Sequence, residues 1–219
     1  MSKRLAALSA LAVPLLFGAV AHAAPMLQVR LAEQGYATQT ITGTNGLATY
    51  AAPYGTFDVV SATGTGTPLG MPVSLIDLSS VQVSSATGGT LQLSITETGL
   101  TSSTAGAAAA FFSAIGGTLG GGNTLTDQTY IDTSNTAFGT ARALANLSFS
   151  GTIPFSGSST NNGNPGTGLF SETEIITLVA SPDTTTSFDA RVNQVPEPAS
   201  MAILGAGLLG LGLIRRRLA

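Results

Sequence analysis

Hydrophobic and polar residues alternate along several short stretches of the chain. In each one, an apolar residue occupies every second position and polar side chains fill the positions between. A period of two with one polar face is typical of antiparallel strands that are wetted on one side. The clearest examples are residues 27–31, 91–95, 145–149 and 188–192, and weaker candidates are 56–61, 73–78, 125–131 and 174–180.

Glycine-rich segments separate these stretches and are predicted to be turns or loops. They are residues 63–67, 120–122 and 156–168. Many short strands separated by such turns predict an all-β fold, an antiparallel β-sandwich.

Residues 105–115 do not follow the alternating pattern. They contain four consecutive alanines, which favour a helix by propensity, but Gly116 and Gly117 follow at once. We favour a strand that turns back through residues 120–122 and pairs with residues 125–131, and a helix is the alternative.

The first 23 residues have the three parts of a secretory signal peptide. Lys3 and Arg4 precede an apolar stretch over residues 5–20, and Ala21 and Ala23 form an A-x-A cleavage site. The mature protein is expected to begin at Ala24 after export through the Sec machinery. An uncleaved membrane anchor is the alternative.

A second apolar run, residues 199–214, carries no charge and is followed by Arg215, Arg216 and Arg217. This pattern predicts a short transmembrane helix of about 24 Å with the arginines on the cytoplasmic side. Its glycines match G-x-G-x-x-G, but a dinucleotide site also needs a preceding strand and an acidic residue about 20 positions later. We therefore assign no nucleotide site.

The tripeptide Pro196-Glu197-Pro198 lies just before this run. A Pro-Glu-Pro, a short Gly/Leu span and a terminal arginine cluster together resemble the PEP-CTERM sorting signal of exported proteins of Gram-negative bacteria. The resemblance covers residues 195–219, with the motif at 195–198. It implies recognition of Pro196, Glu197 and Pro198 by an exosortase, an integral-membrane cysteine protease. It also implies a precursor held briefly in the inner membrane before transfer to the cell surface or medium. The body is loosely similar to the β-sandwich domains that precede this tail.

Residues 24–194 form the predicted exported domain, which is acidic. It has ten acidic residues and three arginines, and it lacks lysine, histidine, cysteine and tryptophan. The negative charge argues against a nucleic-acid partner. Without histidine, thiol or lysine, the usual catalytic triads, Schiff-base chemistry and His/Cys zinc sites cannot form. We expect no enzyme activity, no cofactor and no metal.

Carboxylates are the remaining candidates for chemistry. Glu172 and Glu174 would point to the same side of a strand, as a glycosidase pair requires, but a solvent-facing edge is the favoured interpretation. Asp127 and Asp132 could bind calcium, although no D-x-D-x-D-G loop is present.

Two further motifs could mark a surface. Thr63, Thr65 and Thr67 would project hydroxyls in a row for ice or sugar, although a flexible loop is favoured there. Asn146 begins an N-x-S sequence within a predicted strand. The sequence thus predicts an exported, non-enzymatic structural or exopolysaccharide-associated protein. A carbohydrate-binding or adhesive module is the alternative, and an ice-binding module is a weaker one.

Overall fold

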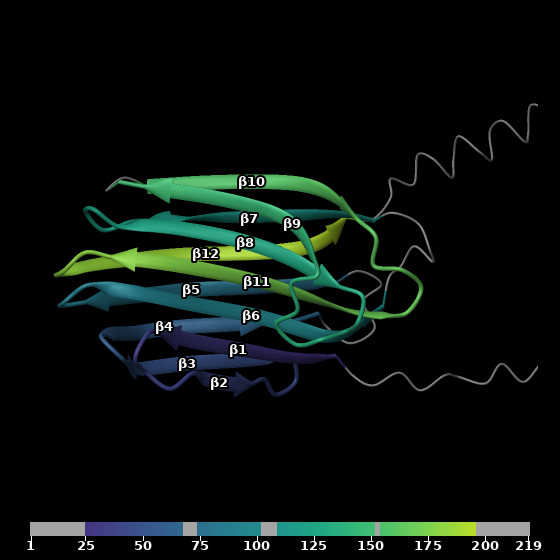
Figure 1. Ribbon diagram of the computed structural model, residues 1–219, viewed down its shortest axis with the longest axis horizontal. Helices are drawn as coiled ribbons and strands as arrows, with labels where there is room; N and C mark the ends of the chain where they lie inside the picture. The colour runs from purple at the N-terminus through teal and green to yellow at the C-terminus, as the bar shows by residue number, and fades with distance from the viewer. Residues whose placement is uncertain (1–24, 68–73, 102–108, 152–153, 196–219) are drawn as a thin grey trace, which may run out of the picture.

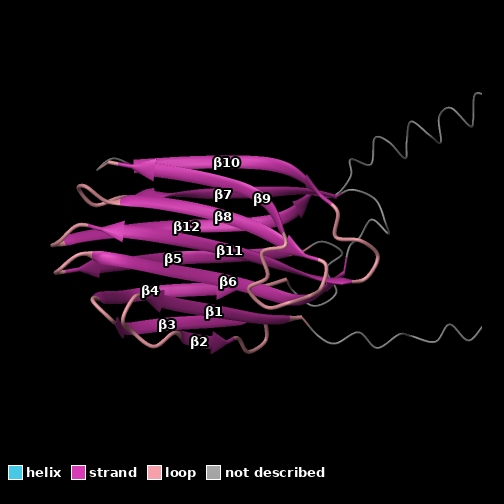
Figure 2. Cartoon of the chain, in the orientation of Figure 1, coloured by secondary structure: helices cyan, strands magenta, loops and turns pink. Residues whose placement is uncertain are grey.

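The computed structural model describes residues 25–67, 74–101, 109–151 and 154–195 (Figure 1). These residues form strands, turns and loops, and none of them is helical (Figure 2). The twelve strands are β1 (Met26–Glu33), β2 (Gln39–Thr42), β3 (Leu47–Tyr54), β4 (Phe57–Thr65), β5 (Leu75–Ser85), β6 (Gly89–Thr101), β7 (Ala109–Thr118), β8 (Thr124–Asp132), β9 (Arg142–Ser150), β10 (Pro154–Gly163), β11 (Leu169–Ala180) and β12 (Thr184–Val195).

The strands form two six-stranded sheets. Sheet A has the order β2-β1-β6-β11-β8-β9, and sheet B has the order β10-β7-β12-β5-β4-β3. Every strand pairing is antiparallel, and Figure 1 shows the strands of the two sheets running along one common direction. The predicted all-β antiparallel sandwich is confirmed. The predicted signal peptide and transmembrane helix lie outside the described residues.

The core lies between the two sheets, where the alternating apolar side chains meet. All the apolar residues of three strongly predicted stretches are buried: Leu27, Val29, Leu31, Leu91, Leu93, Ile95, Phe188, Ala190 and Val192. In the fourth stretch Ala145 is buried, while Leu147 and Phe149 pack half-buried against the core. The period-two pattern therefore located the inner faces of these strands.

Residues 109–115 belong to strand β7, as favoured over a helix, while residues 105–108 lie outside the described part. The predicted pairing of this strand with residues 125–131 is wrong. β7 pairs with β10 and β12 in sheet B, whereas β8 lies in sheet A, so the chain crosses between sheets after β7. The polar inner residue Ser113 of β7 instead faces β8 across the interior and hydrogen-bonds Thr129 at 2.7 Å.

The segments 63–67 and 156–168, which were predicted as loops, are partly strands, while residues 66–67 and 164–168 lie outside strands as predicted. Residues 154–163 form β10, and Thr63 to Thr65 complete β4. Glycine occurs in these strands because the backbone lies close to a neighbouring side chain. A Cβ at Gly64 would lie 2.8 Å from Val29, and one at Gly157 would lie 2.7 Å from the Phe149 ring.

The two ends of the sandwich differ. The turns after β3, β5 and β11 lie at one end and are two or three residues long. β1 begins and β12 finishes at the opposite end, together with the connections after β8 and β10 (Figure 1). The last residue of β12 therefore lies at the same end of the sandwich as the first residue of β1.

Candidate functional site

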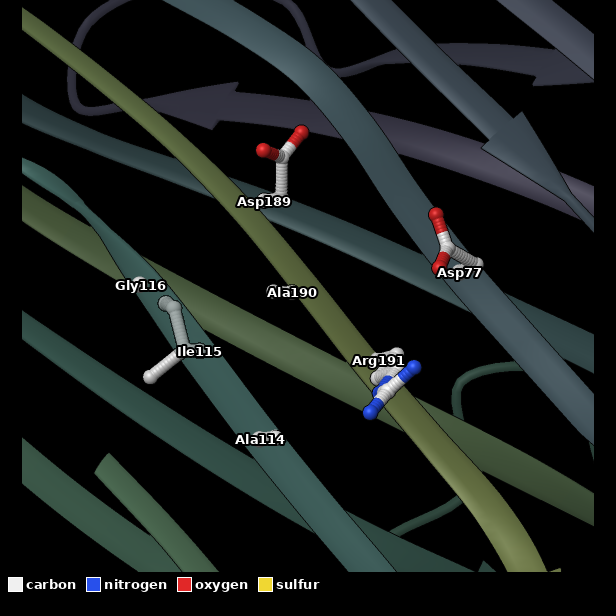
Figure 3. Close-up of a pocket in the computed structure, with 7 residues that line it drawn as sticks. All are labelled: Asp77, Ala114, Ile115, Gly116, Asp189, Ala190 and Arg191. Atoms are coloured by element: carbon white, nitrogen blue, oxygen red, sulfur yellow. The ribbon is translucent and has the colours of Figure 1, made fainter. Parts of the chain in front are cut away.

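A shallow hollow of about 240 Å³ lies over the centre of sheet B on its outer face (Figure 3). It lies over strands β5, β7 and β12. Antiparallel register places Arg191 between Asp77 and Ala114, and Asp189 beside Gly116. The small residues of β7 leave room next to the charged residues of β5 and β12. The lining residues are Asp77, Ala114, Ile115, Gly116, Asp189, Ala190 and Arg191.

The charged groups of this hollow are held in place by the surrounding strands. The backbone N–H of Ser80 donates to Asp189 Oδ1 at 2.6 Å, next to an irregularity in the β12–β5 pairing. The guanidinium carbon of Arg191 lies 5.4 Å from the centre of the Phe112 ring. Burial, reinforced by Asp189, raises the pKa of Asp77, and Arg191 opposes this rise. The hollow thus offers guanidinium donors and carboxylate acceptors side by side.

Hydroxyl groups extend this polar surface across sheet B. Thr65 lies next to Asp77 in the register, and Thr63 lies next to Ser79. Two threonines of the T-x-T-x-T array therefore lie on a strand rather than in a flexible loop. Thr67 is different: it is buried, with its backbone N–H and its hydroxyl bonded to Glu97. The array does not continue as a row along one face.

Glu172 and Glu174 point to the same side of β11, as predicted, but that side is the interior. The favoured solvent-facing edge is wrong, because β11 is hydrogen-bonded on both sides, to β6 and to β8. Both glutamates have no exposed surface. Neither carboxyl group can reach a polysaccharide chain in this fold, so we assign no glycosidase role to the pair.

Glu172 lies opposite Glu97 in the β11–β6 register, and both carboxyl groups have hydroxyl partners. Ser74 donates its hydroxyl to Glu172. Glu97 accepts the Thr67 hydroxyl at 2.6 Å and the Thr67 backbone N–H at 2.9–3.0 Å. Burial raises the pKa of Glu172 to about 8 and raises that of Glu97, whose bonds to Thr67 work against the rise.

Glu174 is paired with Asp127, which lies on the inner face of the neighbouring strand β8. In the β11–β8 register Glu174 lies opposite Thr129 and Asp127 lies opposite Ile176, so the two carboxyl groups occupy diagonal positions on neighbouring strands. Neither accepts a hydrogen bond from any N–H or from another residue's hydroxyl in the described part of the chain. Burial raises the pKa of Asp127 to about 7, and burial followed by repulsion from Asp127 raises the pKa of Glu174 well above its usual value.

Asp127 and Asp132 are not brought together by the fold. Asp132 lies at the end of β8, where it accepts the Ser134 N–H at 2.8 Å and the Ser134 hydroxyl at 2.6 Å. This is a local turn rather than a calcium loop. Across the described ranges, no cluster of three or more acidic, histidine or cysteine residues has the arrangement of a metal site.

Sequence reasoning missed Asp77, Asp189 and Arg191 as a group. Asp189 and Arg191 occupy outward positions of the predicted strand 188–192. This alternation was the one sign in the sequence that the two charged side chains share a surface. Their neighbours on β5 and β7 depend on a strand order that alternation alone does not provide. Asn146 is exposed on β9, in the strand where it was predicted.

The sorting residues follow the domain without a linker. Strand β12 finishes at Val195, and Pro196 is the next residue. The predicted residues Ala21, Ala23, Ala24, Pro196, Glu197, Pro198 and Arg215 to Arg217 lie outside the described residues. No helix within the described ranges is long and apolar enough to cross a membrane.

Comparison with known proteins identifies the tail. The family described as "PEP-CTERM protein-sorting motif" matches residues 194–217. The chain therefore carries this motif, the recognition signal of exosortase, which implies export and membrane-anchored sorting. No curated protein matches the sequence.

Several solved structures resemble the body at low similarity. The module TmCBM61 in complex with β-1,4-galactotriose is 9% identical with a TM-score of 0.37, over 75% of this chain and 86% of that one. The enzymatically active domain of tailspike protein 4 of bacteriophage CBA120 is 15% identical with a TM-score of 0.35, over 66% and 20%. TmCBM27, a carbohydrate-binding module that recognises mannan, is 9% identical with a TM-score of 0.31, over 68% and 86%. At this similarity, none of them assigns a ligand or an activity to this chain.

Proposed function

We propose that the chain is an exported, non-enzymatic β-sandwich protein that is processed at its tail and becomes a structural or exopolysaccharide-associated component outside the cell. The observation that carries this proposal is the sorting motif directly behind the last strand of a complete two-sheet domain. Export would place the sandwich beyond the inner membrane. The stop at Arg215 to Arg217 would hold Pro196 to Pro198 at the membrane surface, within reach of a membrane-embedded protease.

Intact-mass analysis of the protein from a strain with its exosortase tests the proposal. We expect the mature species to lack residues 203–217. Replacement of Pro196, Glu197 and Pro198 by alanine should leave export unchanged and leave an uncleaved, membrane-bound form. Pro182→Ala, in an exposed turn after β11, is the matched control and should be processed normally. A wild-type protein that keeps residues 203–217 in that strain would contradict the proposal.

Carbohydrate binding is the second candidate function, and the hollow on sheet B favours it. Arg191, Asp77 and Asp189 present charge-assisted hydrogen-bonding groups, and threonine hydroxyls lie alongside them. Such groups could recognise the hydroxyls of a sugar chain that lies across the sheet.

A glycan array with the isolated domain, followed by calorimetry, tests this second function. A binder that uses the hollow should lose at least about tenfold in affinity on Arg191→Ala, which corresponds to one charge-assisted hydrogen bond. Arg142→Ala, at the β9 edge of sheet A, should bind as the wild type does. Equal loss in both variants, or no glycan bound at all, would rule out the hollow as a sugar site.

A further inference from the structure

Three acidic side chains lie between the sheets without a cation. Asp127, Glu172 and Glu174 have no exposed surface. The arginines of the described residues all lie elsewhere: Arg30 lies 3.9 Å from the Phe138 ring, Arg142 donates to the Asn162 carbonyl, and Arg191 lines the outer hollow. We propose that Asp127, Glu172 and Glu174 form a proton-binding site inside the sandwich, so that the fold is most stable in acidic media and loses stability as the medium becomes neutral and then alkaline.

The buried position of the Asp127–Glu174 pair, without donors or a cation, favours a bound proton. An ionised carboxylate has only acceptor atoms, so in a buried position it needs donors or a counter-ion, whereas a protonated carboxyl group carries no charge. All four oxygens of the pair lack a hydrogen-bond partner in the described part of the chain. Two adjacent anions that lack both donors and a counter-ion would be strongly unfavourable in a buried position. The folded protein therefore retains a proton there.

The surrounding groups add negative charge or none at all. Glu97 on β6 and Asp77 on β5 are the other titratable groups that act on the cluster, and both disfavour further ionisation. The remaining polar groups nearby are neutral: Ser74, Ser113, Thr129 and Gln194. The two ionisable groups that act on the cluster from outside, Glu97 and Asp77, therefore both favour its protonated form.

The direction of the pH effect follows from these positions. In the unfolded chain the carboxyl groups lose their protons near their usual pKa values of 3.8 and 4.5, while burial holds the pKa of Asp127 at about 7 and that of Glu172 at about 8. Between these limits the folded state binds more protons than the unfolded state. The free energy of unfolding therefore falls as the pH rises from about 4 to about 8.

The site is linked to the strand that enters the sorting tail. Ser74 donates its hydroxyl to Glu172, and the Ser74 carbonyl accepts the backbone N–H of Gln194 at 3.0 Å. Gln194 is the first residue of the matched sorting motif. Ionisation of Glu172 should therefore loosen the last residues of β12 before the rest of the sandwich.

Thermal unfolding of the folded domain across the pH range tests the proposal. For the wild type, we expect the midpoint to fall by at least about 5 °C between about pH 5 and pH 9. The double substitution Asp127→Asn and Glu174→Gln keeps the side-chain shapes but removes two titratable groups. Glu172→Gln does the same for the third carboxyl group. Each variant should flatten the profile. Asp58→Asn, on an exposed position of β4, is the matched control and should retain the wild-type slope.

Two further measurements distinguish proton binding from a purely structural role. The infrared spectrum of the wild type near neutral pH should contain a protonated-carboxyl band, which disappears in the triple amide variant. Amide exchange at Gln194, corrected for its intrinsic base catalysis, should accelerate with pH in the wild type but not in Glu172→Gln. A midpoint that stays level or rises from pH 5 to pH 9, or a wild-type spectrum without the protonated band, would overturn the proposal.

Discussion

At the scale of single residues, Thr67 and its hydrogen bonds explain how a carboxylate is tolerated in this core. Glu97 is only 1% exposed, yet it accepts the backbone N–H and the hydroxyl of Thr67. The same hydroxyl accepts the Leu75 N–H at 3.0 Å. One threonine side chain therefore links β5 to a buried glutamate of β6. Thr65, two residues earlier, makes no side-chain hydrogen bond within the described part of the chain and lies on the outer face of β4.

This difference predicts unequal effects of the same substitution within the T-x-T-x-T array. Thr67→Val keeps the side-chain shape but removes the hydroxyl from Glu97, and should lower the free energy of unfolding by about 1–3 kcal/mol. Thr65→Val should change it by less than about 0.5 kcal/mol, as is typical of an outward-facing position. Denaturant unfolding of both variants measures the difference. Equal effects would show that the hydroxyl of Thr67 does not support Glu97.

At the scale of elements, the approach of β7 to β12 depends on Gly117, the second of two adjacent glycines. A Cβ at Gly117 would lie 2.0 Å from the Ser187 carbonyl oxygen and 2.7 Å from the Phe188 Cα. At Gly116 the nearest atom would be the Phe155 carbonyl oxygen, at 3.4 Å. The two backbones can therefore lie together at Gly117 only without a side chain.

Alanine substitution at the two positions tests this contact. Gly117→Ala forces β7 and β12 apart and should cost about 1–3 kcal/mol or more of stability, as overpacking does. Gly116→Ala meets only an ordinary contact and should be nearly neutral. The midpoints of denaturant unfolding compare the two variants directly. Comparable stability for both would contradict the close approach.

The sequence was sufficient to predict strands wherever one face is apolar and the other polar. It did not reveal β10, because serine, threonine and asparagine fill the outer positions of that edge strand and glycine occupies inner ones. The sequence also led us to place Glu172 and Glu174 on a solvent-facing edge, whereas both are buried. Polar residues normally mark the wet face, but here both faces of the first half of β11 are buried. The connection between β8 and β9 covers the outer face of β11. The Ser171 hydroxyl donates to the Thr136 carbonyl, and the Phe138 N–H donates to the Thr96 hydroxyl on the adjacent strand β6.

The hollow on sheet B could be predicted only in part for a related reason. Alternation placed Asp189 and Arg191 on the outside of one strand. The neighbours of that strand are β5 and β7, which are distant in the sequence. Strand order in a sandwich depends on long-range pairing, which no local pattern encodes.

At the scale of the whole molecule, the sorting tail is an extension of a central strand rather than of an edge. β12 lies between β7 and β5, and its pairings run to Val195, opposite Ala110. The fold therefore limits where the tail can be cut. A cut beyond Val195 leaves both sheets complete, whereas a cut before β12 removes the middle of sheet B.

Two truncations test this limit. A chain of residues 24–195 retains every described strand pairing, so it should unfold cooperatively with the midpoint of the full-length mature protein. A chain of residues 24–183 lacks β12, so the inner side chains of β5 and β7 lose Phe188, Ala190 and Val192, which are 4%, 2% and 0% exposed. Loss of two large buried apolar side chains and one buried alanine costs about 4–7 kcal/mol, comparable to the whole stability of a domain, so this chain should not fold. Circular dichroism and thermal unfolding measure both. A folded 24–183 chain, or a 24–195 chain that loses its cooperative transition, would show that the sandwich does not depend on its last strand in this way.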